Sequence, residues 1–275
     1  MARTAAKTTA PAVKRENKRY LRGIILIAVV FCCFGLLALG CWQFKKLLFE
    51  HNDHFLLRRV VIDSPGWWGK TEDSRNRLLS KLQLNVKEDN LFSYQLPKLR
   101  QLLCSIPSIE SAQVERILPD TLKLTISERI PRAFLGNSQS NLVLDFSGMV
   151  MSKDECVEIN PRMPVIFGHP TEGVTPGTRL PQLQPVLEVI SEALMNFGDF
   201  RIVAIRISQT DAIQLKLFYK DSRLYNVLMP PGNANYYLNM LQSAIEEALR
   251  TNNRKPNANL TYDGGVVFTD DPIGI

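Results

Sequence analysis

Residues 23–42 read GIILIAVVFCCFGLLALGCW, a run of twenty residues without a single charged side chain. At a rise of about 1.5 Å per residue, a helix of this length spans roughly 30 Å, which is the thickness of the hydrocarbon core of a bilayer. The run therefore predicts one transmembrane helix. It separates a short N-terminal tail from more than two hundred residues of ordinary globular composition.

The distribution of charge on the two sides of this helix predicts its orientation. The tail, residues 1–22, carries seven Lys or Arg against one Glu, whereas only Lys45 and Lys46 follow the apolar run closely. Because Lys and Arg near a membrane helix stay on the cytoplasmic side, we expect a cytoplasmic tail and an exported C-terminal region. The tail's excess of six equals the formal charge of the whole chain, +6, so the exported region is neutral and no nucleic-acid partner is expected.

Two alternatives to an uncleaved anchor exist for the apolar run. A cleaved signal peptide has a shorter apolar region, about 7 to 15 residues, followed by a small-x-small site, and no such site follows here. The stretch Ala38-Leu39-Gly40-Cys41 is similar to a lipoprotein cleavage box, in which Cys41 would be acylated, but Ala38 replaces the usual Leu and the bulky Trp42 follows. We favour the anchor, and lipidation of Cys41 stays the alternative.

The cysteines do not indicate a disulfide framework. Cys32, Cys33 and Cys41 fall inside the apolar run, which leaves Cys104 and Cys156 as the only pair outside it. A secreted disulfide scaffold has a higher density of cysteine. We expect Cys104 and Cys156 to be two separate small apolar fillers.

After a juxtamembrane segment at residues 43–57, residues 58–131 predict a small α+β domain. Thr71 is a good helix N-cap, and Pro107 stops the second helix. Leu122, Leu124 and Ile126 alternate with polar residues, which predicts a strand with one buried face. In chain order the patterns predict a strand at 59–62, helices at 71–82 and 96–105, and strands at 109–117 and 122–126, a βααββ unit in which Leu99 and Leu103 pack over the last strand.

Residues 132–269 predict a larger sheet domain with two helices packed on it, followed by a tail at residues 270–275. Alternating apolar residues and turn signals separate its elements. The predicted strands are 142–144, 165–167, 202–207, 213–219, 225–229 and a last strand at 260–268, interrupted at Asp263-Gly264-Gly265, and the predicted helices are 183–197 and 235–250. The fold class is therefore α+β behind one membrane helix.

Several short motifs follow one another in an order that resembles a known family. After the lone membrane helix, they resemble the POTRA domain of the bacterial cell-division proteins FtsQ and DivIB, and later motifs are similar to the β domain of that family. The motifs are Asn90-Leu91-Phe92, Ile106-Pro107-Ser108-Ile109, Leu118-Pro119-Asp120-Thr121-Leu122, Ser127-Glu128-Arg129-Ile130-Pro131, Leu144-Asp145-x-x-Gly148, Met163-Pro164-Val165-Ile166-x-Gly168 and Leu260-Thr261-Tyr262-Asp263-Gly264-Gly265.

The resemblance implies a scaffold without catalytic residues, cofactor or metal. Proteins of this family are anchored in the inner membrane as single-pass type II proteins and gather at the division septum. Their POTRA domain contacts other components of the division machinery, and their β domain holds small bitopic coiled-coil proteins of the FtsB and FtsL type. The complex regulates septal peptidoglycan synthesis, and we expect the same role here.

The end of the chain is the expected partner-binding site. A last strand at the edge of a sheet offers unpaired N–H and C=O groups to another strand. The resemblance implies that the stretch around Tyr262 holds the coiled-coil partner in this way, with glycines that let its backbone approach. The residues are Tyr262, Gly264, Gly265, Val266, Val267 and Phe268. The alternative is that the apolar ones pack under the second helix of this domain.

Patterns that would indicate an enzyme are weak. Gly69-Lys70-Thr71 follows a strand and opens a helix, but Ser64 stands where a phosphate-binding loop requires Gly. His51 and His54 are too few for a zinc site. We therefore expect a protein that is not an enzyme. The alternative function is a POTRA-containing envelope transport or assembly adaptor, a class that usually has tandem POTRA units or a barrel.

Overall fold

The computed structural model describes residues 13–45, 52–156, 159–207, 212–262 and 264–272. The first element is the helix α1 (Val13–Lys45), in which residues Ile24–Cys41 are long and apolar enough to cross a membrane and are not buried by any other part of the protein. The expected helix over the apolar run is present, but its helical backbone begins ten residues before position 23. Lys and Arg are good helix formers, so a helix nucleated by the apolar run can continue into the basic tail.

The short helix η2 (Asp53–Phe55) follows α1, and the elements from β1 to β3 then form the small domain. Its sheet has the order β1-β3-β2, with β1 parallel and β2 antiparallel to the central β3. The predicted order of strand, helix, helix, strand and strand is confirmed, and the sequence patterns missed only the one-turn helix α2. The elements are β1 (Arg59–Asp63), α2 (Trp67–Lys70), α3 (Glu72–Leu82), α4 (Leu96–Cys104), β2 (Ile109–Ile117) and β3 (Thr121–Glu128).

The core of the small domain lies between this sheet and its two longer helices. Leu122, Leu124 and Ile126 are buried in one cluster with Leu99 and Leu103 of α4, as their spacing predicts. Trp68 is also fully buried there, and its indole N–H donates a hydrogen bond of 3.0 Å to Ser108 Oγ. A buried indole N–H requires such a partner.

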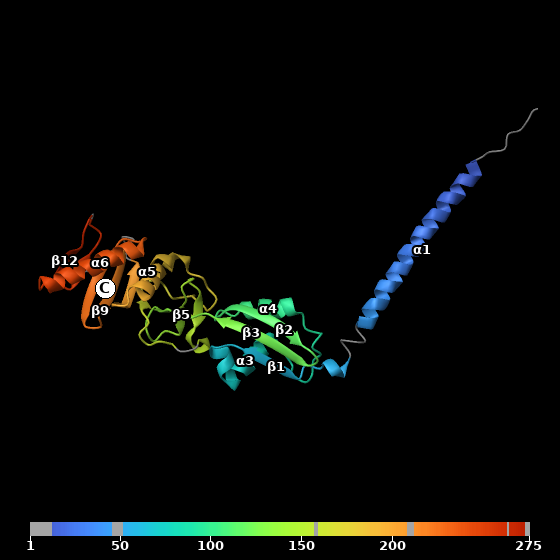
Figure 1. Ribbon diagram of the computed structural model, residues 1–275, viewed down its shortest axis with the longest axis horizontal. Coiled ribbons are helices and arrows are strands. Elements are labelled where there is room, and N and C mark those ends of the chain that lie inside the picture. Colours follow the sequence, from blue (N-terminus) through green and yellow to red (C-terminus); the bar gives the residue numbers. More distant parts are fainter. Residues whose placement is uncertain (1–12, 46–51, 157–158, 208–211, 263, 273–275) are drawn as a thin grey trace, which may run out of the picture.

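The larger domain is built on a nine-stranded sheet of order β12-β11-β10-β9-β8-β7-β4-β5-β6. The helices α5 and α6 lie side by side on it (Figure 1), and their buried residues share one core with the strands. The sequence patterns missed β4, β6 and β11. The elements are β4 (Ala133–Leu135), β5 (Leu142–Leu144), β6 (Val150–Ser152), η3 (Lys153–Glu155), β7 (Val165–Ile166), η4 (Pro181–Leu183), α5 (Gln184–Asn196), β8 (Phe200–Ile207), β9 (Ile213–Tyr219), β10 (Arg223–Met229), α6 (Ala234–Arg250), β11 (Asn257–Asn259) and β12 (Val267–Thr269).

The predicted last strand at 260–268 is wrong in its extent. The chain instead forms two short strands, β11 parallel to β10 and β12 antiparallel to β11, joined by a loop. The sequence pattern did not predict β11, because Asn257 and Asn259 lie in it and Asn is disfavoured in strands. Asn257 is tolerated there since its side-chain amide is satisfied: it accepts a hydrogen bond of 2.8 Å from Asn226 and donates one of 2.8 Å to the carbonyl of Asp271.

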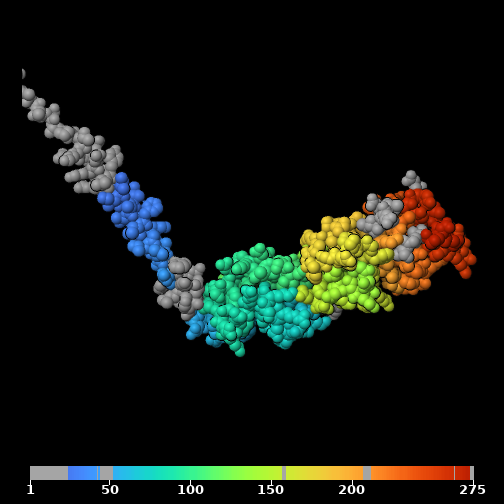
Figure 2. All heavy atoms as spheres, turned by 180° about the vertical axis from the view of Figure 1, so that it is seen from behind, coloured from blue at the N-terminus to red at the C-terminus, as the bar shows by residue number. Residues whose placement is uncertain are grey.

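The small and the larger domain meet end to end (Figure 2). Among the described residues, two ion pairs join them. Arg129, which follows β3, pairs with Asp145, which follows β5, at 2.9 Å, and Lys81 of α3 pairs with Glu155. The motifs around Arg129 and Asp145, separate in the sequence, therefore meet at one junction.

The two cysteines outside the membrane helix are free, but they differ in burial. Cys156 is buried, and burial raises the pKa of its thiol to about 12. Cys104 is exposed at the end of α4, so the expectation that it is a buried filler is wrong. It follows the buried Leu103 directly and is turned about 100° away from it around the helix axis.

Candidate partner-binding edge

The strand β12 forms one edge of the nine-stranded sheet. It pairs with β11 through Asn257 with Thr269, Ala258 with Phe268 and Asn259 with Val267. No strand among the described residues pairs with its outer side. Figure 1 shows β12 at the end of the sheet that lies farthest from the small domain. The expected position of the last strand at a sheet edge is therefore present, with a template for a further strand.

The side chains of residues 266–268, which lead into β12, alternate between the core and the solvent. Val266 and Phe268 are partly buried against the main core, and the Phe268 ring lies 6.3 Å from the ring of Tyr225. Val267 points outward and is 47% exposed. Val267 is thus free for contact with a partner, whereas Phe268 can offer only the part of its ring that the core leaves uncovered.

The loop before β12 is open to solvent. The Tyr262 side chain is 59% exposed. Gly264 has a φ of +85°, a conformation that side chains other than glycine rarely adopt. A Cβ atom added at Gly264 or Gly265 would meet no atom within 4 Å, so this chain leaves room for another backbone there. Asp263 lies outside the described residues.

The loop before Gly69-Lys70-Thr71, which has some likeness to a phosphate-binding loop, holds the carboxylate of Glu128. Glu128 accepts hydrogen bonds from the backbone N–H groups of Trp67 at 2.8 Å and Trp68 at 2.9 Å, and also from the Ser64 hydroxyl. These are the amides that a phosphate would need at the start of α2. The sequence reasoning missed this role of Glu128, although the residue belongs to the motif Ser127-Glu128-Arg129.

No metal site occurs in the part of the chain that the structure describes. Within those ranges no three His, Cys, Asp or Glu side chains lie close enough together to hold an ion. His54 is exposed, and its backbone N–H donates a hydrogen bond to the side-chain oxygen of Asn52. His51, the other histidine of that segment, lies outside the described residues.

Comparison with known proteins agrees with this architecture. The family described as "POTRA domain, FtsQ-type" matches residues 69–129, which run from α2 to the end of β3 and its following residue. A protein of Koribacter versatilis (strain Ellin345) named "Cell division protein FtsQ" is 24% identical over 266 residues, which cover 95% of this chain and 73% of that relative. These matches show an FtsQ-type POTRA domain at residues 69–129, and they show that most of the chain is similar to a cell division protein FtsQ.

Proposed function

We propose that this protein is a bitopic scaffold of the division machinery in the inner membrane. It recruits small bitopic coiled-coil division proteins of the FtsB and FtsL type and helps to regulate septal peptidoglycan synthesis. The tail at residues 1–22 is cytoplasmic, and the POTRA domain at 58–131 and the β domain at 132–269 are periplasmic. The observation that carries the proposal is the free outer side of β12 beside an exposed Tyr262.

Strand addition assigns a role to each part of the edge. The backbone N–H and C=O groups on the outer side of β12 bind the main chain of the partner and supply affinity. Val267 and Tyr262 contact side chains of the partner and supply specificity, because both are largely exposed. Phe268 supports the strand from within through its contact with Tyr225. Gly264 and Gly265 leave space for the partner's backbone.

The small domain faces other components of the division machinery. No step of this proposal requires a chemical reaction. The carboxylate of Glu128, which backbone amides hold, is part of the fold of the small domain. Its role is to fix the loop between β1 and α3.

Both the orientation and the location can be tested with two fusions to the same fluorescent protein. A fluorescent protein that matures only in the cytoplasm, placed before Met1, should fluoresce and should concentrate at mid-cell in dividing cells. The same fusion after the last residue should stay dark. A dark N-terminal fusion would contradict the charge-based orientation. A bright but uniform envelope signal would favour the transport or assembly adaptor.

The partner edge can be tested with Tyr262→Ala and Gly265→Glu. In the full chain in nanodiscs, each should weaken capture of the small coiled-coil division protein at least tenfold and leave the melting temperature within a few degrees, because both positions are open. Tyr262→Phe and Gly265→Ala are the matched controls and should retain capture. Loss of capture together with a large drop in melting temperature would show that the strand is a core element, and retained capture would place the interface elsewhere.

A further inference from the structure

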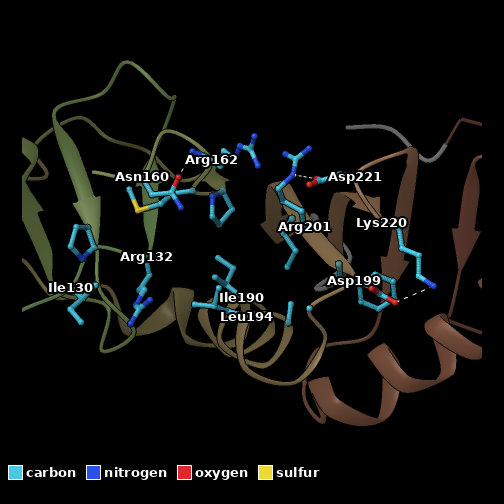
Figure 3. Close-up of a pocket in the computed structure, with 17 residues that line it drawn as sticks. Ile130, Arg132, Asn160, Arg162, Ile190, Leu194, Asp199, Arg201, Lys220 and Asp221 are labelled. Atoms are coloured by element: carbon cyan, nitrogen blue, oxygen red, sulfur yellow. Dashed lines mark hydrogen bonds and ion pairs between the residues drawn. The ribbon is translucent and has the colours of Figure 1, made fainter. Parts of the chain in front are cut away.

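A second candidate site is a pocket at the N-terminal ends of three neighbouring parallel strands. The strands β4, β7 and β8 pair in parallel, with Phe134 opposite Val165 and Val165 opposite Ala204. The N-terminal ends of these three strands therefore lie next to one another on one side of the sheet. A pocket of about 530 Å³ opens there, next to the C-terminal half of α5 (Figure 3). Its volume is in the range of pockets that bind specific ligands.

The floor of this pocket is apolar. Ile190 and Leu194 of α5 line it together with Ile202 of β8. Leu194 is 58% exposed, and Ile130, from the segment between the two sheets, is 61% exposed. Two large aliphatic side chains on the two sides of one pocket leave apolar surface uncovered. A ligand that fills the pocket gains free energy by removing this surface from water.

Each of the three parallel strands contributes one arginine to the pocket. Arg132 directly precedes β4, Arg162 comes shortly before β7, and Arg201 is the second residue of β8. Two of the guanidinium groups lie over aromatic rings, Arg132 at 4.8 Å from Phe146 and Arg201 at 4.5 Å from Phe218. These contacts orient the planar groups before any ligand binds.

The positive charge of the pocket is only partly balanced. Arg201 forms an ion pair with Asp221, and Lys220 forms one with Asp199 at 3.5 Å. Within the described ranges, neither Arg132 nor Arg162 has an ion pair. Figure 3 shows Arg162 and Arg201 extending toward each other over the apolar floor, with Asp221 beside Arg201.

The positive charge of Arg162 also acts on the carboxylate of Asp221. The hydrogen bond from Arg201, and then the positive charges of Arg201 and Arg162, hold the pKa of Asp221 below its ordinary value. Arg201 thus forms the ion pair with Asp221, whereas Arg162 acts on that carboxylate through its charge alone. This leaves an unbalanced positive charge at the mouth of an apolar pocket, where a second carboxylate can bind.

We propose that this pocket binds a segment of a partner protein in which an apolar side chain lies next to an Asp or Glu. The apolar side chain fills the floor between Ile130 and Leu194, and the carboxylate accepts hydrogen bonds from Arg162 and Arg201. Planar, bidentate binding of a carboxylate is the typical use of arginine. Met195, the residue of α5 after Leu194, is also exposed and lies outside the pocket lining, which fits a peptide segment better than a small molecule. The site is separate from β12 and does not depend on the function proposed for that strand.

Photo-crosslinking in dividing cells tests this proposal. A photoreactive amino acid placed at Leu194 of the full chain should crosslink a protein, and sequencing of the crosslinked peptide should place an Asp or Glu within about one helical turn of an apolar residue. Arg162→Glu should lower the yield at least tenfold, and Arg162→Gln should lower it less. The exposed cation Lys98, on α4, provides the control Lys98→Glu, which should leave the yield unchanged.

The decisive result is a charge exchange. Replacement of the identified acidic residue of the partner by Lys should restore crosslinking to the Arg162→Glu variant. Capture of the coiled-coil protein at β12 by purified Arg162→Glu chain should be unaffected, so a failure here is distinguishable from a failure of the edge. The proposal is overturned if the crosslinked peptide lacks an acidic residue, if the yield is indifferent to Arg162→Glu, or if Leu194 crosslinks only lipid or cell-wall material.

Discussion

Replacement of Asp145 by Ala should lower the free energy of unfolding by about 3 to 5 kcal/mol, the usual cost of removing one partner from a buried ion pair. Asp145 and Arg129 are only 10% and 13% exposed, and their side chains lie 2.9 Å apart. Asp145 also accepts hydrogen bonds of 2.9 Å from the N–H groups of Ser147 and Met149. The substitution therefore leaves a buried guanidinium group without its counter-charge and two amides without their acceptor.

Denaturant unfolding of the full chain in detergent micelles measures this effect. Asp73→Ala, which breaks an ion pair of α3 whose two side chains are more than half exposed, is the control and should cost less than about 1 kcal/mol. The double variant Arg129→Met and Asp145→Leu should be more stable than Asp145→Ala, because it leaves no buried charge alone. Equal losses for Asp145→Ala and Asp73→Ala would show that the junction does not contribute to stability.

Leu124→Ala should cost about 2 to 5 kcal/mol through lost burial and the cavity that it leaves. Leu124 is fully buried in the middle of β3, the central strand of the small sheet. It lies opposite Ile62 of β1 and Val114 of β2, so neighbours on both sides restrict how far the site can collapse.

The matched control is Leu102→Ala, a substitution of the same size on the exposed face of α4. It should change the free energy of unfolding by less than about 1 kcal/mol, since surface substitutions are nearly neutral. If the two variants unfold at the same denaturant concentration, the assignment of Leu124 to the core is refuted.

The small domain was predictable because its signals are local. The alternation of Leu122, Leu124 and Ile126 and the cap at Thr71 each act within a few residues, and each strand or helix is long enough to repeat its period. The order of the elements then followed from the chain itself. The register of β1 with β3 was not predictable, because parallel pairing depends on residues that are distant in sequence.

The larger domain was less predictable for two physical reasons. The strands β4, β6 and β11 have three residues each, too few to repeat a period of two. Asn257 and Asn259 also contradict the strand propensity of β11. The side chain of Asn257 compensates through tertiary hydrogen bonds to Asn226 and Asp271, and that of Asn259 accepts local ones from Thr261. A strand that is stabilised by contacts with neighbouring strands has only a weak strand pattern in its own sequence.

Of the two candidate sites, only the edge was accessible from the sequence. It lies in one continuous stretch around Tyr262, which a family motif can mark. The pocket depends on Arg132, Arg162 and Arg201, which are far apart in the chain and meet only because three parallel strands begin at one edge. No window of sequence contains that constellation.

The strand order of the larger domain sets a length that a partner must match. With about 4.8 Å between neighbouring strands, the eight steps from β6, beside the small domain, to β12 amount to roughly 38 Å. A helix needs about 25 residues to cover this distance. The width of the sheet thus sets a minimum length for the partner. Under the proposed strand addition, a coiled-coil protein that leaves the membrane beside α1 needs a stalk of at least this order to reach β12, and a shorter stalk would fail to dock even with every contact residue intact.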